Sequence, residues 1–185
     1  MKFLKFLLIF FITLPSAIKA DLNKNLIKEL KKGGNVIFIR HAYAPGGGDP
    51  DNFEINDCDT QRNLNNSGKL QAKNIGNFFK KNEIPIHRVF SSEWCRCKET
   101  AFLSFKDFET KNFLNSFYSF KFLKNKNNQM KKLKKYIDEW QNEKNLVLIT
   151  HYVVISEALG YKASSGEIVV SDKYFKKIGS IKVGY

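Results

Sequence analysis

Residues 35–42 read NVIFIRHA, an apolar run that ends in an arginine and a histidine. An unbroken run of β-branched and aromatic residues is typical of a strand that is buried on both faces. Residues 146–151 read LVLITH and repeat the arrangement, because a short apolar run again leads directly into a histidine. Strands of this kind belong to parallel sheets, so the two histidines are expected at equivalent ends of two strands.

Helical patterns and apolar runs alternate along the rest of the chain. Residues 86–90 form another buried strand, after which Ser91-Ser92 is expected to cap a helix that ends near Phe105. Strands that alternate with helices predict an α/β fold, a three-layer αβα sandwich with a mostly parallel central sheet. The other predicted helices cover residues 21–32, 65–82, 127–142 and 152–159, and a terminal pair of strands covers residues 168–170 and 174–183.

The first twenty residues form a separate unit of the sequence. They read MKFLKFLLIFFITLPSAIKA, with two early lysines, a short apolar core and small residues before a cleavage point after Ala20. This pattern predicts a signal peptide over residues 1–20, and an uncleaved membrane anchor is the alternative. The rest of the sequence has no apolar stretch long enough to span a bilayer. We therefore expect an exported protein, in a bacterial periplasm, with no membrane span in the mature chain.

Length and composition indicate one globular domain after the signal peptide. The chain has 185 residues, of which 43% are hydrophobic and 26% charged, with only 11 Gly and 4 Pro. These values exclude a collagen-like, mucin-like or wholly disordered chain. Residues 21–185 contain no repeat, linker or low-complexity block, so they are predicted to form a single domain.

The charge balance is strongly positive, with 31 Lys and Arg against 18 Asp and Glu and a net charge of +13. The excess is almost entirely lysine and is spread along the chain, without a stacking or groove-reading motif. No nucleic-acid partner is therefore expected. A lysine-rich surface attracts anionic substrates, and binding of polyanions or of the cell-envelope surface is the alternative use for it.

Polar groups follow three of the predicted strands, at the edge where open α/β sheets bind ligands. These groups are Arg40-His41, Ser91-Ser92 with Arg96 one helical turn later, and Thr150-His151. Guanidinium groups bind phosphate oxygens in a bidentate manner, and a neutral imidazole is a good nucleophile near pH 7. The strand ends therefore predict a phosphate pocket. No acidic cluster at metal-ligand spacing is evident, so the arginines would supply the positive charge that Mg²⁺ supplies elsewhere.

Four blocks of the chain carry these groups, and they cover most of residues 35–160. The blocks are Arg40-His41-Ala42, the segment QRNLNNSG at residues 61–68 with Gln71-Ala72 after it, the segment SSEWCRCKETA at residues 91–101, and Thr150-His151. In content and order they resemble the motifs of the histidine phosphatase (phosphoglycerate mutase-like) superfamily. The resemblance implies a phosphoglycerate mutase-like fold.

The resemblance also implies a role for each matching residue. His41 would be the nucleophile and would pass through a phosphohistidine. Arg40 and Arg96 would hold the phosphoryl oxygens, His151 would complete their pocket, and Arg62 would support it. No metal ion and no cofactor would take part.

The general acid is the part of the pattern that the sequence does not match. Tyr152 follows the second histidine, whereas the acid phosphatase branch of the family has an aspartate close behind it. The other branch takes its acid from a glutamate further along the chain. Glu93 and Glu167 are the acids that we select here, from a wider set that also includes Asp107 and Glu109.

The expected function is a phosphomonoesterase that acts on a small anionic phosphate ester through a phosphohistidine intermediate. A mutase is disfavoured because the chain lacks the insertions that shape a mutase site. The alternative is a non-catalytic phosphate- or polyanion-binding protein that keeps the arginine pocket. Residues 42–60 and 106–126 would set specificity, and neither segment contains a motif that names the substrate.

Three cysteines remain, Cys58, Cys95 and Cys97, which allow one disulfide and leave one thiol. No zinc site is expected, because no Cys or His lies near them at ligand spacing. If Arg62 and Arg96 face one phosphate, Cys58 and Cys95 are brought close together as well. We therefore predict a Cys58–Cys95 bond, with Cys97 as the alternative partner.

Overall fold

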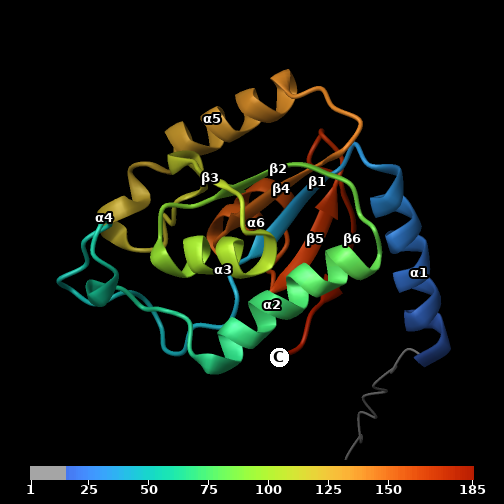
Figure 1. Cartoon of the computed structure of the whole chain (residues 1–185). Helices are drawn as coiled ribbons and strands as arrows, with labels where there is room; N and C mark the ends of the chain where they lie inside the picture. The colour runs from blue at the N-terminus through green and yellow to red at the C-terminus, as the bar shows by residue number, and fades with distance from the viewer. Residues whose placement is uncertain (1–15) are drawn as a thin grey trace, which may run out of the picture.

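Figure 1 shows the fold in a computed structural model that describes residues 16–185. The predicted signal peptide, residues 1–20, lies outside the described residues apart from its last five. The helices are α1 (Ser16–Lys32), α2 (Asn66–Lys81), α3 (Cys95–Phe105), α4 (Phe120–Leu123), α5 (Lys126–Glu139) and α6 (Tyr152–Leu159), with 3₁₀ turns at Cys58–Thr60 and Asn112–Leu114. The strands are β1 (Val36–Arg40), β2 (Ile86–Ser91), β3 (Glu109–Thr110), β4 (Asn145–Thr150), β5 (Glu167–Ser171) and β6 (Lys177–Lys182).

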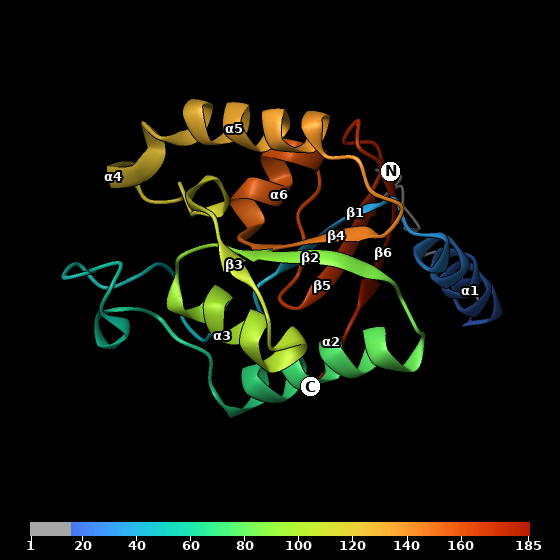
Figure 2. The same ribbon diagram turned by 45° about the horizontal axis from the view of Figure 1, so that its top comes forward.

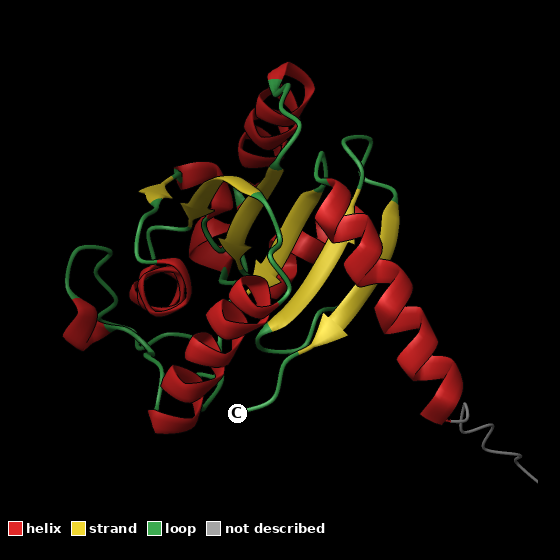
Figure 3. Ribbon diagram, turned by 45° about the vertical axis from the view of Figure 1, so that its right-hand side comes forward, coloured by secondary structure: helices red, strands yellow, loops and turns green. Residues whose placement is uncertain are grey.

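The six strands form one sheet in the order β3-β2-β4-β1-β5-β6. Strands β3, β2, β4 and β1 pair in parallel with one another, whereas β5 pairs antiparallel with both β1 and β6. Figure 3 shows this sheet as a twisted layer between helices. β4 lies between β1 and β2, so the ends of all three strands meet at one edge. The mostly parallel sheet predicted from the sequence is confirmed.

The apolar strands are buried on both faces because alternate residues serve two separate cores. Ile37 and Ile39 of β1 pack with apolar residues of α1, α2 and α3. Val36 and Phe38 pack on the opposite face with residues of α5 and α6. Figure 2 shows the two groups of helices on opposite sides of the sheet. This arrangement is the predicted three-layer αβα sandwich.

A buried asparagine pair fixes the amino ends of β1 and β4. Asn145 is completely buried, and its amide donates to the carbonyl oxygens of Leu30 and Pro85. Its side-chain oxygen accepts from the backbone N–H of Asn35, at the start of β1. Structural contacts therefore occupy this end of the sheet, opposite the end at which His41 and His151 follow their strands.

Some element boundaries differ from the prediction. α1 begins at Ser16 instead of residue 21. Ser91 is the last residue of β2, and Trp94 occupies the cap position of α3 without a side-chain hydrogen bond. The predicted Ser91-Ser92 cap is thus wrong, and Ser92 has another partner, described below. Between Ser16 and the C-terminus, no helix combines the length and apolar character that are needed to cross a membrane.

Candidate active site

The two predicted strand-end histidines lie side by side. His41 follows β1 and His151 follows β4, and these parallel strands pair Arg40 with Thr150 at their last positions. The His41 N–H donates to the carbonyl oxygen of Thr150 at 2.9 Å, which extends the pairing by one residue. The two imidazole centroids are 5.4 Å apart, and each residue is only 2% exposed. The sheet register alone therefore brings the pair together.

Hydrogen bonding fixes which nitrogen of His41 carries the lone pair. Nδ1 lies 2.8 Å from the carbonyl oxygen of Ala42, an atom that can only accept, so Nδ1 carries the hydrogen. Nε2 then carries the lone pair, and the Nε–H of Arg96 donates to it at 3.2 Å. The unprotonated nitrogen of His41 thus faces the guanidinium of Arg96.

Burial and positive charge keep both imidazoles neutral. The pKa of His41 is held well below 6.5, first by burial and then by the guanidinium of Arg96, with smaller contributions from Arg40 and Arg62. Burial and Arg96 also lower the pKa of His151 well below that value. A neutral imidazole keeps its lone pair, so His41 is a competent nucleophile at neutral pH.

His151 is oriented by residues of the β2–α3 connection. Its Nε2 lies 2.9 Å from the hydroxyl of Ser92 and 3.5 Å from the thiol of Cys97. The Ser92 hydroxyl also contacts the side chain of Asn115. The sequence pattern predicted Ser92 as a helix cap, but its hydroxyl contacts the second histidine instead.

The backbone after His41 is fixed from behind by α2 and α3. The Ala42 N–H donates to the Thr100 hydroxyl at 3.0 Å, and the Tyr43 N–H donates to the Gln71 side chain at 2.9 Å. A Cβ on Gly68 would overlap the carbonyl oxygen of Tyr43, so only glycine allows this close approach. Gln71 and Thr100 both lie in the sequence blocks that resemble the family motifs. Their side chains therefore hold the backbone that follows His41.

Three arginines surround the histidines. Arg96, from α3, is 3% exposed and forms a bidentate pair with Asp49, at 2.6 and 3.1 Å. Arg40 donates to the carbonyl oxygen of Ala163 and lies over the Tyr152 ring. Arg62 donates to the carbonyl oxygens of Gly48 and Ala44. The structure thus brings together all five residues that the sequence placed in the phosphate pocket.

These five residues line one cavity of about 510 Å³. Its inner end holds the imidazoles and guanidiniums. Its outer walls come from Trp94 and from two connecting segments, the first at residues 42–60 and the second at residues 106–126. The remaining lining residues are Gly46, Gly47, Gly48, Asp49, Pro50, Asp51, Phe53, Ser116, Tyr118, Ser119, Lys121, Phe122 and Tyr152. A tetrahedral anion at the inner end would face three guanidiniums and the lone pair of His41.

The acids selected from the sequence lie elsewhere. Glu93 lines a neighbouring cavity, and its carboxylate accepts from Asn115. Glu167 lies in β5, where its carboxylate accepts from the Ser164 N–H and the Tyr161 hydroxyl. Burial raises the pKa of Glu167, but these hydrogen bonds outweigh it and lower the pKa. Among residues 16–185, the acids that line the main cavity are Asp49 and Asp51.

Asp49 is the site residue that sequence reasoning missed. It accepts from Arg96, from the Trp94 indole at 3.0 Å and from the Arg62 N–H at 3.2 Å. Burial raises its pKa, but the bonds from Arg96 and Trp94 outweigh that effect and lower it. The three glycines before Asp49 were the available signal, because Gly46 and Gly48 adopt positive φ angles that favour glycine.

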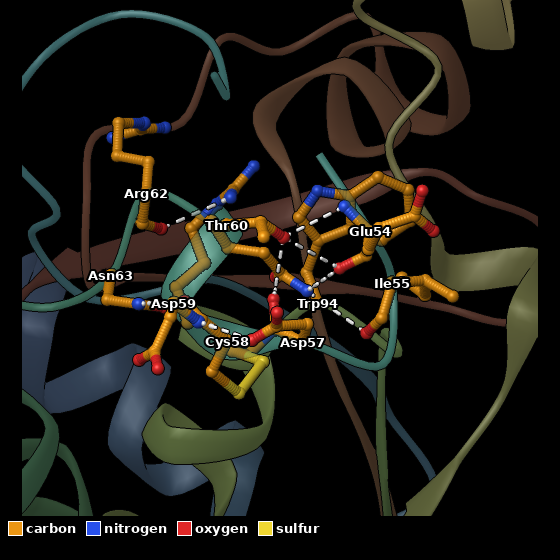
Figure 4. The surroundings of a disulfide bond; sticks show 12 residues. Glu54, Ile55, Asp57, Cys58, Asp59, Thr60, Arg62, Asn63 and Trp94 are labelled. Atoms are coloured by element: carbon orange, nitrogen blue, oxygen red, sulfur yellow. Dashed lines mark hydrogen bonds between the residues drawn. A yellow bond between two sulfur atoms is a disulfide. The ribbon is translucent and has the colours of Figure 1, made fainter. Parts of the chain in front are cut away.

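A disulfide attaches the first connecting segment to α3. Cys58 and Cys95 are bonded, with their Cα atoms 5.7 Å apart, which is the pairing that the sequence favoured. Figure 4 shows the bond beside a dense set of hydrogen bonds that involve Thr60 and Glu54. Cys97 is a buried free thiol, and burial raises its pKa to about 12. It is therefore protonated and unreactive at neutral pH.

The part of the chain that the structure describes contains no group of three or more His, Cys, Asp or Glu side chains that could hold a metal ion. Positive charge at the inner end of the cavity comes from arginine side chains.

Comparison with known proteins yields matches at the level of structure. No family model matches the sequence, and no curated protein matches it. The protein histidine phosphatase SixA, solved with tungstate, is 15% identical with a TM-score of 0.53 over 80% of this chain and 96% of that one. An Agrobacterium tumefaciens protein described as a SixA phosphohistidine phosphatase is 18% identical. Its TM-score is 0.54 over 80% of this chain and 98% of that one.

A protein of Thermus thermophilus, TTHB049, is 15% identical with a TM-score of 0.56 over 80% of this chain and 99% of that one. These similarities extend over nearly the full length of each neighbour. The protein therefore has the fold of the histidine phosphatase superfamily.

Proposed function

We propose that this protein is a metal-independent phosphomonoesterase in which His41 is phosphorylated and then hydrolysed. The observation that carries the proposal is the environment of the His41 Nε2 atom. Its lone pair is fixed by the Nδ1 contact with Ala42 and faces Arg96 in a cavity that Arg40 and Arg62 also line. A neutral nucleophile beside several guanidiniums suits attack on a phosphoryl group.

The arginines supply binding and charge stabilisation. A phosphate monoester would place its phosphoryl oxygens among the guanidiniums of Arg40, Arg62 and Arg96. Their fixed charges would stabilise the oxygens while the phosphoryl group is transferred. His151 stands 5.4 Å from His41 between ring centroids and is neutral, so it adds a further hydrogen-bonding group to the pocket.

In the first step, the lone pair of His41 Nε2 forms a bond to phosphorus while the bond from phosphorus to the leaving group breaks. The leaving group departs with that electron pair. The Nδ1 hydrogen remains directed at the Ala42 carbonyl oxygen, which stabilises the positive charge of the phosphorylated ring. In the second step, a water oxygen bonds to phosphorus, the P–Nε2 bond breaks, and the proton of water passes to solvent.

The carboxylates in the cavity bear on the substrate class. Asp49 is paired with Arg96 and has a lowered pKa, so it is ionised and is a poor proton donor. We therefore infer a leaving group that needs little protonation, such as an aryl phosphate. The structural neighbour described as a protein histidine phosphatase makes phosphohistidine a second substrate to test.

Substitution of His41 is the direct test. His41→Ala should lower kcat for an aryl phosphate by at least about a thousandfold, because it removes the nucleophile. The matched control is His87→Ala, because His87 is exposed at the far end of β2. Wild-type enzyme quenched with denaturant during turnover of ³²P-labelled substrate should carry an acid-labile label on the peptide that contains His41. Full activity in His41→Ala, or a label on another residue, would refute the mechanism.

A non-catalytic phosphate-binding role is the second candidate. It is favoured by one observation: both glutamates selected as acids, Glu93 and Glu167, lie outside the lining of the cavity. The two roles differ in turnover of an aryl phosphate with a good leaving group. The wild-type chain should release phosphate from it repeatedly, whereas a binding protein would saturate without release.

We also propose that the protein is exported and loses residues 1–20. The Cys58–Cys95 bond supports this proposal, because disulfides persist in oxidising compartments such as the bacterial periplasm. Expression of the full chain followed by cell fractionation tests it. The expected product is a periplasmic protein that begins at Asp21, and retention of residues 1–20 on a membrane-bound form would overturn it.

A further inference from the structure

The guanidinium of Arg96 offers hydrogen-bond donors on two distinct edges. The outer edge consists of its two terminal nitrogens, Nη1 and Nη2, and the inner edge consists of Nε and Nη2. The group is planar and rigid, so the direction of one edge determines the direction of the other.

Asp49 occupies the outer edge completely. Its Oδ1 accepts from Nη1 at 2.6 Å and its Oδ2 accepts from Nη2 at 3.1 Å, which is the bidentate geometry of a strong charge-assisted pair. The second hydrogen of Nη1 points to the carbonyl oxygen of Arg62 at 3.3 Å. The outer edge therefore has no donor left for a ligand.

The inner edge faces the nucleophile. Nε donates to His41 Nε2 at 3.2 Å, and the second hydrogen of Nη2 lies on the same edge. A phosphoryl group bonded to His41 Nε2 would place an oxygen within reach of both donors. Arg96 can therefore serve the phosphoryl group while it keeps its pair with Asp49.

Asp49 is itself held firmly. The Trp94 indole donates to Oδ2 at 3.0 Å and the Arg62 N–H donates to Oδ1 at 3.2 Å. The Cys58–Cys95 bond attaches the same loop to the residue before Arg96. Asp49 and Arg96 have side chains that are 17% and 4% exposed, so solvent screens their contact weakly.

We propose that Asp49 is a positioning residue, whose carboxylate holds the outer edge of Arg96 and thereby directs the inner edge at the reacting nitrogen of His41. The proposal rests on the phosphatase function proposed above. The opposite role is that Asp49 competes with phosphate for Arg96 and must be displaced before substrate binds.

The direction in which one substitution changes anion affinity distinguishes these two roles. Asp49→Asn removes a negative charge from the cavity, and that change alone would strengthen the binding of an anion. Loss of positioning has the opposite effect, because a mobile Arg96 binds and stabilises the phosphoryl group less well. Asp51→Asn is the charge-matched control, since Asp51 lines the same cavity two residues away and is exposed.

Calorimetry with inorganic phosphate and with tungstate, and kinetics with an aryl phosphate, provide the measurements. We expect Asp49→Asn to raise both dissociation constants several-fold and to lower kcat by more than tenfold with a smaller change in KM. Asp51→Asn should bind both anions slightly more tightly than wild type. Asp49→Glu, which keeps the carboxylate, should restore part of kcat.

Tighter anion binding by Asp49→Asn, or behaviour equal to that of wild type, would overturn the positioning role while leaving the phosphatase function in place. A wild-type chain that neither binds nor hydrolyses any of these compounds would refute the proposed function instead. If Asp49→Asn does not fold, NMR of the wild-type chain still decides. Added phosphate should shift the Arg96 Nε–H signal and leave the Asp49 carboxyl ¹³C signal unchanged, whereas displacement would move the carboxyl signal.

Discussion

The two segments that wall the cavity are built in opposite ways. The first, residues 42–60, is attached by the Cys58–Cys95 bond, and its one large cavity-facing apolar side chain, Phe53, is 8% exposed. The second, residues 106–126, presents Tyr118 at 61% and Phe120 at 92% exposure. The first contributes Asp49 to the phosphate end, whereas the second contributes aromatic and lysine side chains near the opening. Under the proposed function, the first wall would serve the phosphoryl group and the second wall would contact the leaving group.

This contrast suits a site that holds some ligand groups firmly and leaves room for variation in others. The groups around the phosphoryl position must be held closely, because small displacements of charge there cost transition-state stabilisation. The groups around the leaving group need only apolar contact, which tolerates movement. Four measurements test this contrast.

The largest effect is expected from removing the disulfide that attaches the first wall, residues 42–60, to α3. The double variant Cys58→Ser, Cys95→Ser should bind inorganic phosphate about tenfold or more weakly, because Asp49 would no longer be held against Arg96. Its free energy of unfolding should fall by roughly 3 kcal/mol, since the bond closes a loop with a sequence separation of 37. Calorimetry and urea unfolding measure the two changes. Dithiothreitol should weaken phosphate binding by wild type and leave the double variant unaffected, and equal responses would contradict the role of the bond.

The pH dependence should follow the arginines on the phosphate side. His41 must be neutral to attack, and its pKa is lowered well below 6.5 by burial, Arg96, Arg40 and Arg62. Activity should therefore persist as pH falls through 6.5 and disappear only when His41 becomes protonated. Arg62→Ala removes a positive charge, so it should raise the pKa of His41. The acid limb of the pH–activity profile, where activity is lost as pH falls, should then move to higher pH. NMR titration of the imidazole C–H signals checks this directly.

Lys121, on the second wall, is the matched control for that titration. It lines the same cavity but is not among the main causes of the lowered pKa of His41. Lys121→Ala should leave the acid limb where it is in wild type. Two results would show that the arginines do not set the protonation of His41. One is an acid limb of the wild-type activity profile at pH 6.5 or above, and the other is an equal shift of that limb in Arg62→Ala and Lys121→Ala.

Truncating the second wall should have a smaller and selective effect. Tyr118 packs against Tyr152 with centroids 5.8 Å apart at the opening of the cavity. Tyr118→Ala should raise KM for an aryl phosphate a few-fold, because aromatic pairs contribute about 1 kcal/mol, and should leave the dissociation constant for inorganic phosphate unchanged. Tyr174→Ala, at another exposed tyrosine, is the control. Weaker phosphate binding by Tyr118→Ala would mean that the two walls do not divide their tasks.

Chelation should have no effect at all. The charge around the phosphoryl position comes from guanidiniums, so dialysis against EDTA should leave kcat and KM at their wild-type values. Inactivation by EDTA that a divalent ion reverses would show that the arginines are insufficient and that a metal ion is required.

Local patterns were enough to predict the inner end of the cavity. Strand burial follows from an apolar run, and the parallel register then places His41 beside His151 without further information. Arg96 and Cys95 could be placed because they lie within one helical turn of a strand end. The Cys58–Cys95 pairing also needed the family resemblance, because only the resemblance placed Arg62 at the anion that Arg96 faces.

Contacts that depend on loop geometry could not be predicted in this way. Asp49 reaches Arg96 across a sequence separation of 47, through glycines whose positive φ angles no local pattern specifies. Ser92 matched a helix-cap pattern, but α3 begins only at Cys95 with Trp94 at the cap position, and the Ser92 hydroxyl contacts His151 instead. Glu93 was one of several candidate acids, but its carboxylate accepts from Asn115 and its side chain lines a different cavity.

The position of β4 also determines when the site can first exist. β4 lies between β1 and β2, although 110 residues separate Asn35 from Asn145 at the starts of β1 and β4. A nascent chain that has not yet delivered residues 145–150 lacks the strand that joins β1 to β2, and with it the neighbour of His41. Such long-range pairing forms late, because chain entropy opposes it until other contacts exist. During synthesis the cavity therefore has no partly active precursor, and its assembly coincides with completion of the sheet.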